Sequence, residues 1–546
     1  MIWSCVALLS SAACSESAAT APDATAVVLP AAVVASLASV DSVTGTFPVD
    51  VIPRFTDGEE NGGWVRQRSK QASPALPAVF LDFPYPSVTG RSIKVDAGDN
   101  LQSALKRARR GDEVVLAAGA TFTGNFTLPA LGGTAADGWI TIRGEASDRL
   151  PPLGTRVSPA DGLLMPKVVT PNTEAALRLA PAASGWRMVG LEVTVLPAVT
   201  QQQYGLLWLG DGSQAQNTLA SVPSDIVLDR MYIHGQPTTN MSRCVALNSA
   251  RTQISDSYLA ECHGRGFDSQ AIWGGNGPGP YKIVNNMLMG AGENIMFGGA
   301  DPSIPNLVPS DIEIRRNYFY TPMSWKGVWL KKNLFETKNA VRVLVEGNVF
   351  DGSWTDGQTG WGFVLKSANQ DGGCRWCRST DITIQRNLIR NVGAGVNIMG
   401  NDGGGGLDTM TRRVLVTENV VEINQPGDLR GFQIINSAQH VTLTRNVLSG
   451  SFNAALLIEN STSHCKFTDN VWAHGQYGVF SSGVGSGTNA LNAGCGSTWT
   501  WTGMTLVGGR QGGYPATTWV ASEASAPLGA QIRASVRAAT TGVAVP

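Results

Sequence analysis

The strongest constraint on the fold is a short pattern that recurs along the chain. In each copy an apolar residue is followed by two polar residues and an asparagine, and further apolar residues follow. The asparagines are Asn286, Asn317, Asn348, Asn387, Asn419, Asn446 and Asn470, at steps of 31, 31, 39, 32, 27 and 24 residues. A unit of this size cannot bury its apolar side alone, so neighbouring units must stack. The repeat therefore predicts an all-β solenoid.

A second apolar segment precedes each asparagine pattern. These segments alternate apolar with free positions, as a β-strand does. They are Val245–Leu247, Ile295–Phe297, Val328–Leu330, Phe363–Leu365, Val396–Ile398, Phe432–Ile434 and Leu456–Ile458. Asparagine tolerates the left-handed backbone of a sharp turn, and stacked amides can hydrogen bond from coil to coil. We therefore interpret the asparagines as structural.

An amphipathic helix is expected over residues 99–110. Leu101, Ala104, Leu105 and Ala108 have the spacing of one helical face. Gly111 follows as a stop signal. Because the end of a solenoid needs a cover, this helix is predicted to cap the N-terminal coil.

The chain resembles a known superfamily at these positions. Asn100–Leu105, Gly111–Leu116 and the asparagine turns resemble the right-handed parallel β-helix proteins of the pectate-lyase-like superfamily, over about residues 91 to 510. The block from Asp268 to Asp301 also resembles one in uncharacterised bacterial proteins. The resemblance implies a single-stranded right-handed parallel β-helix with an N-terminal amphipathic capping helix. It does not imply one activity, since lyases, hydrolases, esterases, epimerases and non-catalytic surface proteins share this fold.

The two ends differ in composition from the repeat. Residues 1–14 read as a signal peptide. It is either a lipoprotein signal, in which Cys14 would carry the lipid, or an ordinary signal. Residues 15–40 read as a disordered tether, 41–90 as an irregular segment packing on the coils, and 511–546 as a tail or cap. We expect an exported monomer, periplasmic, secreted or held at the outer membrane, with a lipid anchor as its only membrane attachment.

Charge and cysteine content narrow the function. With 41 basic and 42 acidic residues, the net charge of −1 gives no basic excess to attract nucleic acid. Six cysteines lie beyond the leader, and an even number in an exported protein predicts disulfides. Cys374 and Cys377 are expected to form a local loop staple.

Long loops and lysines suggest a site. Loops 274–280, 298–309, 331–339, 367–380 and 400–411 follow the second strands and are expected to form one wall. Aligning these strands on Phe297, Leu330 and Leu365 places Lys331 and Lys366 next to each other on adjacent coils. Neighbouring ammonium groups lower each other's pKa, which favours a neutral lysine that can act as a base.

These features together predict β-elimination of a uronic-acid polysaccharide. Either Lys331 or Lys366 is expected to remove the proton and the other to neutralise the carboxylate, and His263 is a further candidate acid or base. The residues expected to bind substrate are Trp329, Asn294, Gln270, Lys332 and Asn397. Asp268, Glu293 and Asp301 offer hard oxygen ligands for Ca²⁺, and the resemblance implies that lyases of this kind often combine Lys or Arg bases with Ca²⁺.

Two other functions remain open at this stage. Asp268, Glu293 and Asp301 also suit a glycoside hydrolase with paired carboxylates. A non-catalytic surface protein that binds glycan is the third possibility. Trp273, Trp354, Trp361 and Trp376 are expected to stack on sugar rings in any of these cases.

Overall fold

The architecture comes from a computed structural model, which describes residues 73–83, 85, 87–402, 406–426, 429–509 and 512–543. The predicted leader at 1–14, the tether at 15–40 and the first part of the 41–90 segment lie outside the described residues. Within the described residues no helix is long and apolar enough to cross a membrane.

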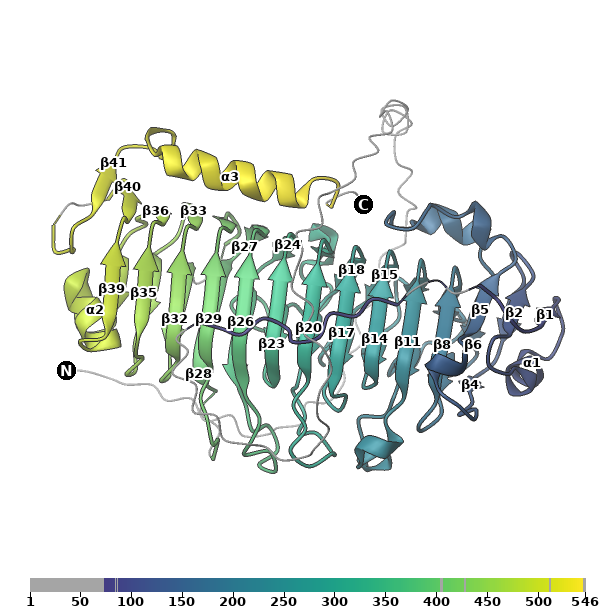
Figure 1. The fold of residues 1–546 in the computed structure, drawn as a ribbon. Coiled ribbons are helices and arrows are strands. Elements are labelled where there is room, and N and C mark those ends of the chain that lie inside the picture. Colours follow the sequence, from purple (N-terminus) through teal and green to yellow (C-terminus); the bar gives the residue numbers. More distant parts are fainter. Residues whose placement is uncertain are drawn as a thin grey trace, which may run out of the picture. The chain divides into compact units, whose positions relative to one another are not determined.

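Three long sheets make up the body (Figure 1), and they confirm the predicted parallel β-helix. Sheet A contains β1 (Ser92–Val95), β2 (Glu113–Leu116), β5 (Ile140–Gly144), β8 (Ser184–Val189), β11 (Ser224–Asp229), β14 (Ala250–Ser255), β17 (Gly279–Val284), β20 (Ser310–Arg315), β23 (Ala340–Glu346), β26 (Ser379–Gln385), β29 (Arg412–Thr417), β32 (Gln439–Thr444), β35 (Cys465–Thr468) and β39 (Trp499–Thr502). Sheet B contains β3 (Thr121–Thr123), β6 (Lys167–Thr170), β9 (Glu192–Val195), β12 (Tyr232–His234), β15 (Tyr258–Cys262), β18 (Met287–Gly290), β21 (Tyr318–Tyr320), β24 (Val349–Ser353), β27 (Leu388–Val392), β30 (Val420–Ile423), β33 (Val447–Gly450), β36 (Val471–Ala473), β40 (Thr505–Val507) and β41 (Thr518–Val520). Sheet C contains β4 (Phe126–Leu128), β7 (Leu177–Leu179), β10 (Leu207–Leu209), β13 (Arg243–Leu247), β16 (Gln270–Gly274), β19 (Glu293–Phe297), β22 (Asn333–Thr337), β25 (Trp361–Ser367), β28 (Ala394–Asn401), β31 (Arg430–Ile435), β34 (Ala454–Ile458), β37 (Gly478–Ser481) and β38 (Gly485–Ser486).

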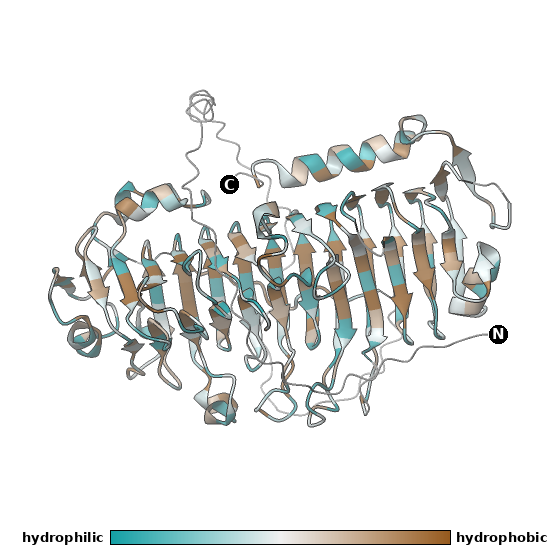
Figure 2. Cartoon of the chain, turned by 180° about the vertical axis from the view of Figure 1, so that it is seen from behind, coloured by the Kyte–Doolittle hydropathy of each residue, from teal (hydrophilic) through white to brown (hydrophobic). Residues whose placement is uncertain are grey.

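Each coil passes through sheets A, B and C in turn, and each strand pairs with the same strand of the next coil. All pairings are parallel except that of β37 with β38. Like positions stack, so that Ile295, Phe335 and Phe363 lie in register and are fully buried. Figure 2 shows the corresponding alternation of hydrophobic and hydrophilic bands along the strands. The core is thus a set of columns that run from coil to coil.

The asparagines form the predicted ladder at the turn between sheets A and B. In one representative step, Asn317 donates its backbone N–H to Asn348 Oδ1 at 2.8 Å, and Asn348 Nδ2 donates to the carbonyl of Ile314 at 3.0 Å. All seven asparagines are buried. The expectation that asparagine itself is left-handed was wrong. The residue before each one has the positive φ, as Arg316 does at 54° and Gly347 at 64°.

Helices cover both ends of the coil. At the N-terminal end α1 (Leu101–Arg107) buries Leu101, Ala104 and Leu105 and is capped by Asn100, whose side chain accepts from Ser103 N. At the other end α2 (Thr488–Cys495) packs on the last strands of sheet C. The predicted capping helix is therefore present.

Three disulfides join the six cysteines. They link Cys244 to Cys262, Cys374 to Cys377 and Cys465 to Cys495. The Cys374–Cys377 link is the local staple that the sequence predicted, and Cys465–Cys495 ties α2 to β35.

The segment before β1 crosses the outer face of sheet A (Figure 1). Ala75 N donates to Asp381 of β26 at 3.1 Å, and Ala78 N donates to Asp311 of β20 at 2.7 Å. Three extended residues span about 10 Å, which matches two strand spacings of about 4.8 Å. We call residues 73–83 the strap.

A third helix, α3 (Pro527–Thr540), lies on the outer face of sheet B. It buries Ile532 and Val536 against Val420, Val447 and Val471. Figure 2 shows its alternating hydropathy, as expected for a helix with one face on the coil. This helix lies within residues 511–546, which were expected to form a tail or cap.

One predicted strand is wrong, and the error matters for the site. Val328–Leu330 is not a strand, and Val328 is 46% exposed. The coil instead uses β22 (Asn333–Thr337), because Phe335 enters the core column of Ile295 and Phe363. Phe297, Thr337 and Leu365 therefore lie opposite one another on adjacent strands.

The loop expectation changes with that register. Loops 275–278, 298–309 and 368–378 follow strands of sheet C as predicted, as do residue 402 and residues 406–411. In the coil of β22, however, the long loop is 321–332 and precedes the strand. Four of the five expected loops therefore lie at the ends of the sheet C strands. The fifth lies where its strand begins.

Candidate functional site

A cluster of mostly charged side chains lies on sheet C and beside both ends of its strands. We call it the lysine–glutamate cluster. Its members are Asp268, Gln270, Glu293, Lys332, Glu336, Lys338 and Lys366. They come from four consecutive coils, because β16, β19, β22 and β25 are neighbours in the sheet.

Lys332 and Glu293 form the first ammonium–carboxylate pair. Lys332 Nζ donates to Asp268 Oδ1 at 2.7 Å and lies 3.6 Å from Glu293 Oε1. Gln270 Nε2 donates to Glu293 Oε2 at 2.8 Å. Burial raises the pKa of Glu293 to about 7, helped by the Glu336 carboxylate and opposed by Lys332. Burial disfavours the charged form of Lys332, but the Glu293 and Asp268 carboxylates outweigh it and raise its pKa.

Lys366 and Glu336 form the second pair. Glu336 Oε1 lies 3.4 Å from Lys366 Nζ and 3.9 Å from Lys338 Nζ. Asn333 Nδ2 donates to Glu336 Oε2 at 2.9 Å. The lysines keep 12–15% of their side chains exposed, whereas Glu293 and Glu336 keep 0% and 1%. In both pairs the ammonium group faces outward and the carboxylate lies beneath it.

The predicted neighbours Lys331 and Lys366 do not stack. With Thr337 in register with Leu365, the residue beside Lys366 is Lys338. Lys331 is fully buried, and its Nζ donates to Thr321 Oγ1 and to the carbonyl of Asn333, both at 3.0 Å. Burial lowers its pKa to about 7, against the opposing effect of Glu293. The enclosed position of Lys331 therefore gives no support to its expected role as the base.

His263 and Trp329 form a structural pair at the edge of sheet C. The His263 ring is fully buried, stacks on Trp329 with centroids 3.9 Å apart, and its Nε2 lies 2.8 Å from Glu261 Oε2. Trp329 therefore packs on a histidine, and the position of His263 gives no support to its expected acid or base role.

The remaining expected substrate contacts divide in two. Asn294 is fully buried and donates to the carbonyls of Leu288 and Tyr320, so it joins sheets B and C internally. Asn397 lies on sheet C, where its Oδ1 accepts from Gln433 Nε2 at 3.1 Å. Of these residues, Gln270 and Lys332 belong to the cluster itself.

The expected Ca²⁺ ligands are not brought together. Asp268 and Glu293 share Lys332, whereas Asp301 accepts from Gly373 N at 2.7 Å in a separate loop contact. Among the described residues, the metal-type group around Asp301 contains Cys374 and Cys377, which are joined in a disulfide and offer no thiolates. This set does not fit a calcium ion.

The cluster nevertheless contains acceptors without donors. Gln270 Oε1, Glu293 Oε1, Asn333 Oδ1 and Glu336 Oε1 are buried and accept no hydrogen bond from the described residues. Buried acceptors normally have partners, and exceptions concentrate where function requires them. Glu336, Asn333 and Lys338 were missed as site residues because Leu330 was expected at the position that Thr337 occupies, which is seven residues later.

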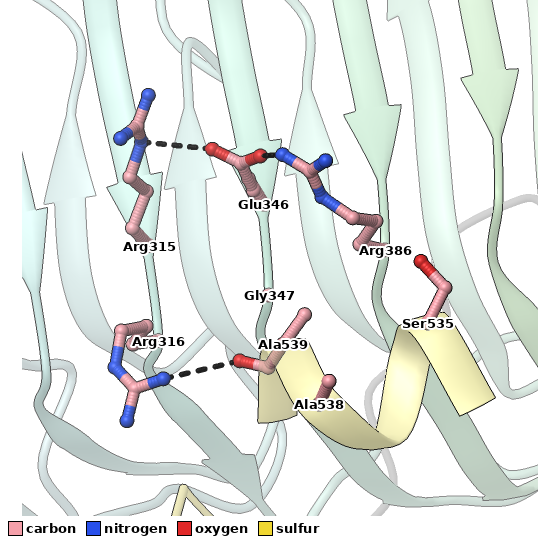
Figure 3. Close-up of a pocket in the computed structure, with 8 residues that line it drawn as sticks. All are labelled: Arg315, Arg316, Glu346, Gly347, Arg386, Ser535, Ala538 and Ala539. Carbon is pink, nitrogen blue, oxygen red and sulfur yellow. Dashed lines mark hydrogen bonds and ion pairs between the residues drawn. The ribbon is translucent and has the colours of Figure 1, made fainter. Parts of the chain in front are cut away.

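A different hollow lies between α3 and the coil (Figure 3). It has a volume of about 430 Å³ and is lined by Arg315, Arg316, Glu346, Gly347, Arg386, Ser535, Ala538 and Ala539. Glu346 pairs with Arg315 at 3.1 Å and with Arg386. Arg316 donates to the carbonyls of Ala539 and Thr541, both at 3.1 Å. These charges are already paired, and they hold the end of α3.

Comparisons with known proteins concern the fold. No family model and no curated protein matches the chain. Similar solved structures include an alginate lyase from Paenibacillus sp. str. FPU-7, with 16% identity, 72% of this chain and 97% of that chain covered, and a TM-score of 0.28. A mannuronic acid specific polysaccharide family 6 lyase from human gut microbiota has 13% identity, coverages of 82% and 95%, and a TM-score of 0.49. A GH87 alpha-1,3-glucanase from Streptomyces thermodiastaticus strain HF3-3 has 11% identity, coverages of 82% and 71%, and a TM-score of 0.47.

Proposed function

We propose that this protein is a polysaccharide lyase that cleaves a uronic-acid polymer by β-elimination at the lysine–glutamate cluster. The observation that carries the proposal is the repeated arrangement of an outward ammonium over a buried carboxylate, Lys332 over Glu293 and Lys366 over Glu336. Two such pairs on neighbouring coils supply cations for an acidic substrate and buried groups that exchange protons with them.

Lys366 is assigned the role of base. To act, its ammonium passes a proton to Glu336, whose carboxylate lies 3.4 Å away. A bound polymer that excludes water favours this neutral pair over the charged one. The neutral amine then removes the proton from the substrate carbon that carries the uronate carboxylate.

Lys332 is assigned the other half of the reaction. Its ammonium stabilises the negative charge that develops on the substrate carboxylate, as preorganised cations do. As the glycosidic bond breaks, Lys332 donates a proton to the leaving oxygen. Glu293, whose pKa of about 7 leaves it partly protonated at neutral pH, returns a proton to Lys332.

The assay uses alginate and polygalacturonate and follows the ultraviolet absorbance of unsaturated uronate products. We expect Lys366→Ala and Lys332→Ala each to lower kcat/KM by about 100-fold or more, as loss of a proton-transfer group does. The control is Lys466→Ala, an exposed lysine on sheet A, which should leave the rate unchanged. Full activity in both cluster variants would refute the assignment. Repeating the assay with EDTA and with added Ca²⁺ tests the calcium expectation, and the lysine pairs predict no loss.

Glycoside hydrolysis is the second candidate. It is favoured by the neighbouring carboxyl groups of Glu293 and Glu336, of which Glu293 has a raised pKa suited to a general acid. Both carboxylates, however, lie under the lysines and are almost fully buried. New reducing ends without unsaturated product would establish hydrolysis, and binding without either product would establish a glycan-binding protein.

A further inference from the structure

The outer face of sheet C continues beyond the cluster toward the N-terminal coils. One position of each strand is in register along the whole sheet. The series is Thr127, Arg178, Trp208, Ala246, Trp273, Met296, Glu336, Val364, Asn397, Gln433, Leu457 and Phe480. Glu336 of the cluster and Trp208 are four strand steps apart in this series, about 19 Å at a spacing of about 4.8 Å. A polymer lying along the series at Glu336 therefore passes over Trp208.

A hollow opens beside Trp208. Its volume is about 200 Å³, and Thr127, Arg178 and Trp208 of the series line it. The rest of its lining comes from the end of β7 and from the loop after β10: Leu179, Ala180, Pro181, Gly210, Asp211, Ala215, Gln216, Ser221 and Pro223. The Arg178 guanidinium lies 5.3 Å from the centroid of the Trp208 ring. Both side chains are partly exposed. The place thus combines an aromatic surface with a cation.

The indole packs closely against Gly205. A Cβ atom at Gly205 would lie 2.5 Å from Trp208 Nε1, so only glycine leaves room for the ring there. Arg243 and Trp273 form a similar pair farther along the sheet, with the guanidinium 4.3 Å from the centroid of the ring. Trp273, however, is only 8% exposed. Trp354 and Trp361 are buried as well, so the expected sugar-stacking role of these three tryptophans is not supported. Of the two tryptophans in the series, Trp208 is the accessible one.

Arg178 is free to exchange its present partner. It pairs with Glu174 at 2.5 Å, and the Glu174 side chain is 59% exposed. Exposed pairs of this kind contribute little stability. A guanidinium binds a carboxylate with two parallel hydrogen bonds, and an indole packs on the apolar face of a sugar ring.

We propose that Arg178 and Trp208 form a second carbohydrate subsite, which holds a uronate unit of the same polymer chain about four strand steps from the reacting bond. Arg178 binds the carboxylate and Trp208 the ring. This inference rests on the proposed function, since it assumes an acidic polymer lying along sheet C. It makes the protein selective for long chains over short ones.

The test measures binding and cleavage separately. Native protein and the variants Arg178→Ala, Trp208→Ala and Gly205→Ala are compared on alginate and polygalacturonate, and on oligosaccharides of the same polymers too short to reach from the cluster to Trp208. Binding is measured by affinity electrophoresis in gels containing each polymer. Arg445→Ala is the matched control, because Arg445 is 39% exposed, pairs with Glu418 and lies away from sheet C.

We expect the three variants to bind polymer about tenfold or more weakly, with KM raised and kcat unchanged, and to cleave short oligosaccharides at the native rate. Native polymer binding in Arg178→Ala and Trp208→Ala would overturn the subsite while leaving the lyase intact. Weakened binding in a protein that cleaves nothing would support the subsite and overturn the lyase. A native protein that neither binds nor cleaves these polymers would overturn both.

Discussion

At the residue scale, Lys331 shows how burial decides what a lysine can do. The sequence marked it as a base beside Lys366, but its side chain is fully enclosed and bonded to Thr321 and Asn333. An ammonium group in such a place loses its hydration, which favours the neutral amine. The residue belongs to the interior beneath the cluster, and Lys332 next to it takes the outward position.

The buried amine predicts a pH dependence of stability. The folded pKa of Lys331 is about 7, below its ordinary value of 10.5. Between these values the unfolded chain binds more protons, so this group makes the free energy of unfolding rise with pH from about 7 to 10.5. Lys331→Met should remove that contribution. The free energy of unfolding of the variant minus that of the native protein, measured by urea titration, should therefore decrease from about pH 7 to pH 10.5. Lys466→Met should show a constant difference, and a constant difference for Lys331→Met would contradict the assignment.

Sequence patterns could predict single residues only where one periodic signal existed. The asparagine ladder was predictable because seven consecutive coils repeat it, and the buried side chains bear it out. The positions of Glu336 and Lys338 could not be predicted. Their coil contains two apolar segments that could each form the strand of sheet C, Val328–Leu330 and Leu334–Phe335. Packing of Phe335 between Ile295 and Phe363 decides between them, and that contact is not local in sequence.

At the scale of elements, the strands and the first helix were predictable and α3 was not. The strands and α1 carry clear apolar periodicity, whereas 511–546 is rich in small residues. α3 exists because Ile532 and Val536 find an apolar patch on sheet B, and because Arg316 binds the carbonyls at its end. Tertiary contact rather than propensity stabilises this helix.

Removing one apolar anchor should loosen α3. Ile532 is fully buried against Val420, Val447 and Val471. Ile532→Ala should cost about 2–4 kcal/mol, as comparable core truncations do. Hydrogen exchange measures the local opening, and we expect faster exchange in α3 while sheet C stays unchanged. Arg537→Ala, at an exposed position of the same helix, is the control, and equal exchange in both variants would show that the packing does not hold α3.

At the scale of the whole molecule, hydrogen bonds of the asparagines join each of these coils to the next and stabilise their stacking. Asn348 accepts from Asn317 N, donates to the Ile314 carbonyl and donates to Asn387 Oδ1. Asn348→Ala removes the partner of the buried Asn317 N–H and of the Ile314 carbonyl, which both lie on the preceding coil. We expect a loss of about 3 kcal/mol, measured by chemical denaturation. Asn424→Ala, at an exposed position, should cost under about 0.5 kcal/mol, and equal losses would argue against the ladder.

The strap has a mechanical consequence for the stacked coils. From Ala75 to Ala78 it crosses two strand spacings, about 10 Å, which is close to the full reach of three residues. Ala75 N and Ala78 N are hydrogen bonded to carboxylates on the strands that flank β23. An extended backbone cannot lengthen further, so it resists tension along the stacking direction on the sheet A side. Bending that opens sheet A should therefore be stiffer than bending the opposite way. Deleting residues 73–83 should remove this directional difference and speed amide exchange in β20, β23 and β26, whereas unchanged exchange would show that the strap carries no tension.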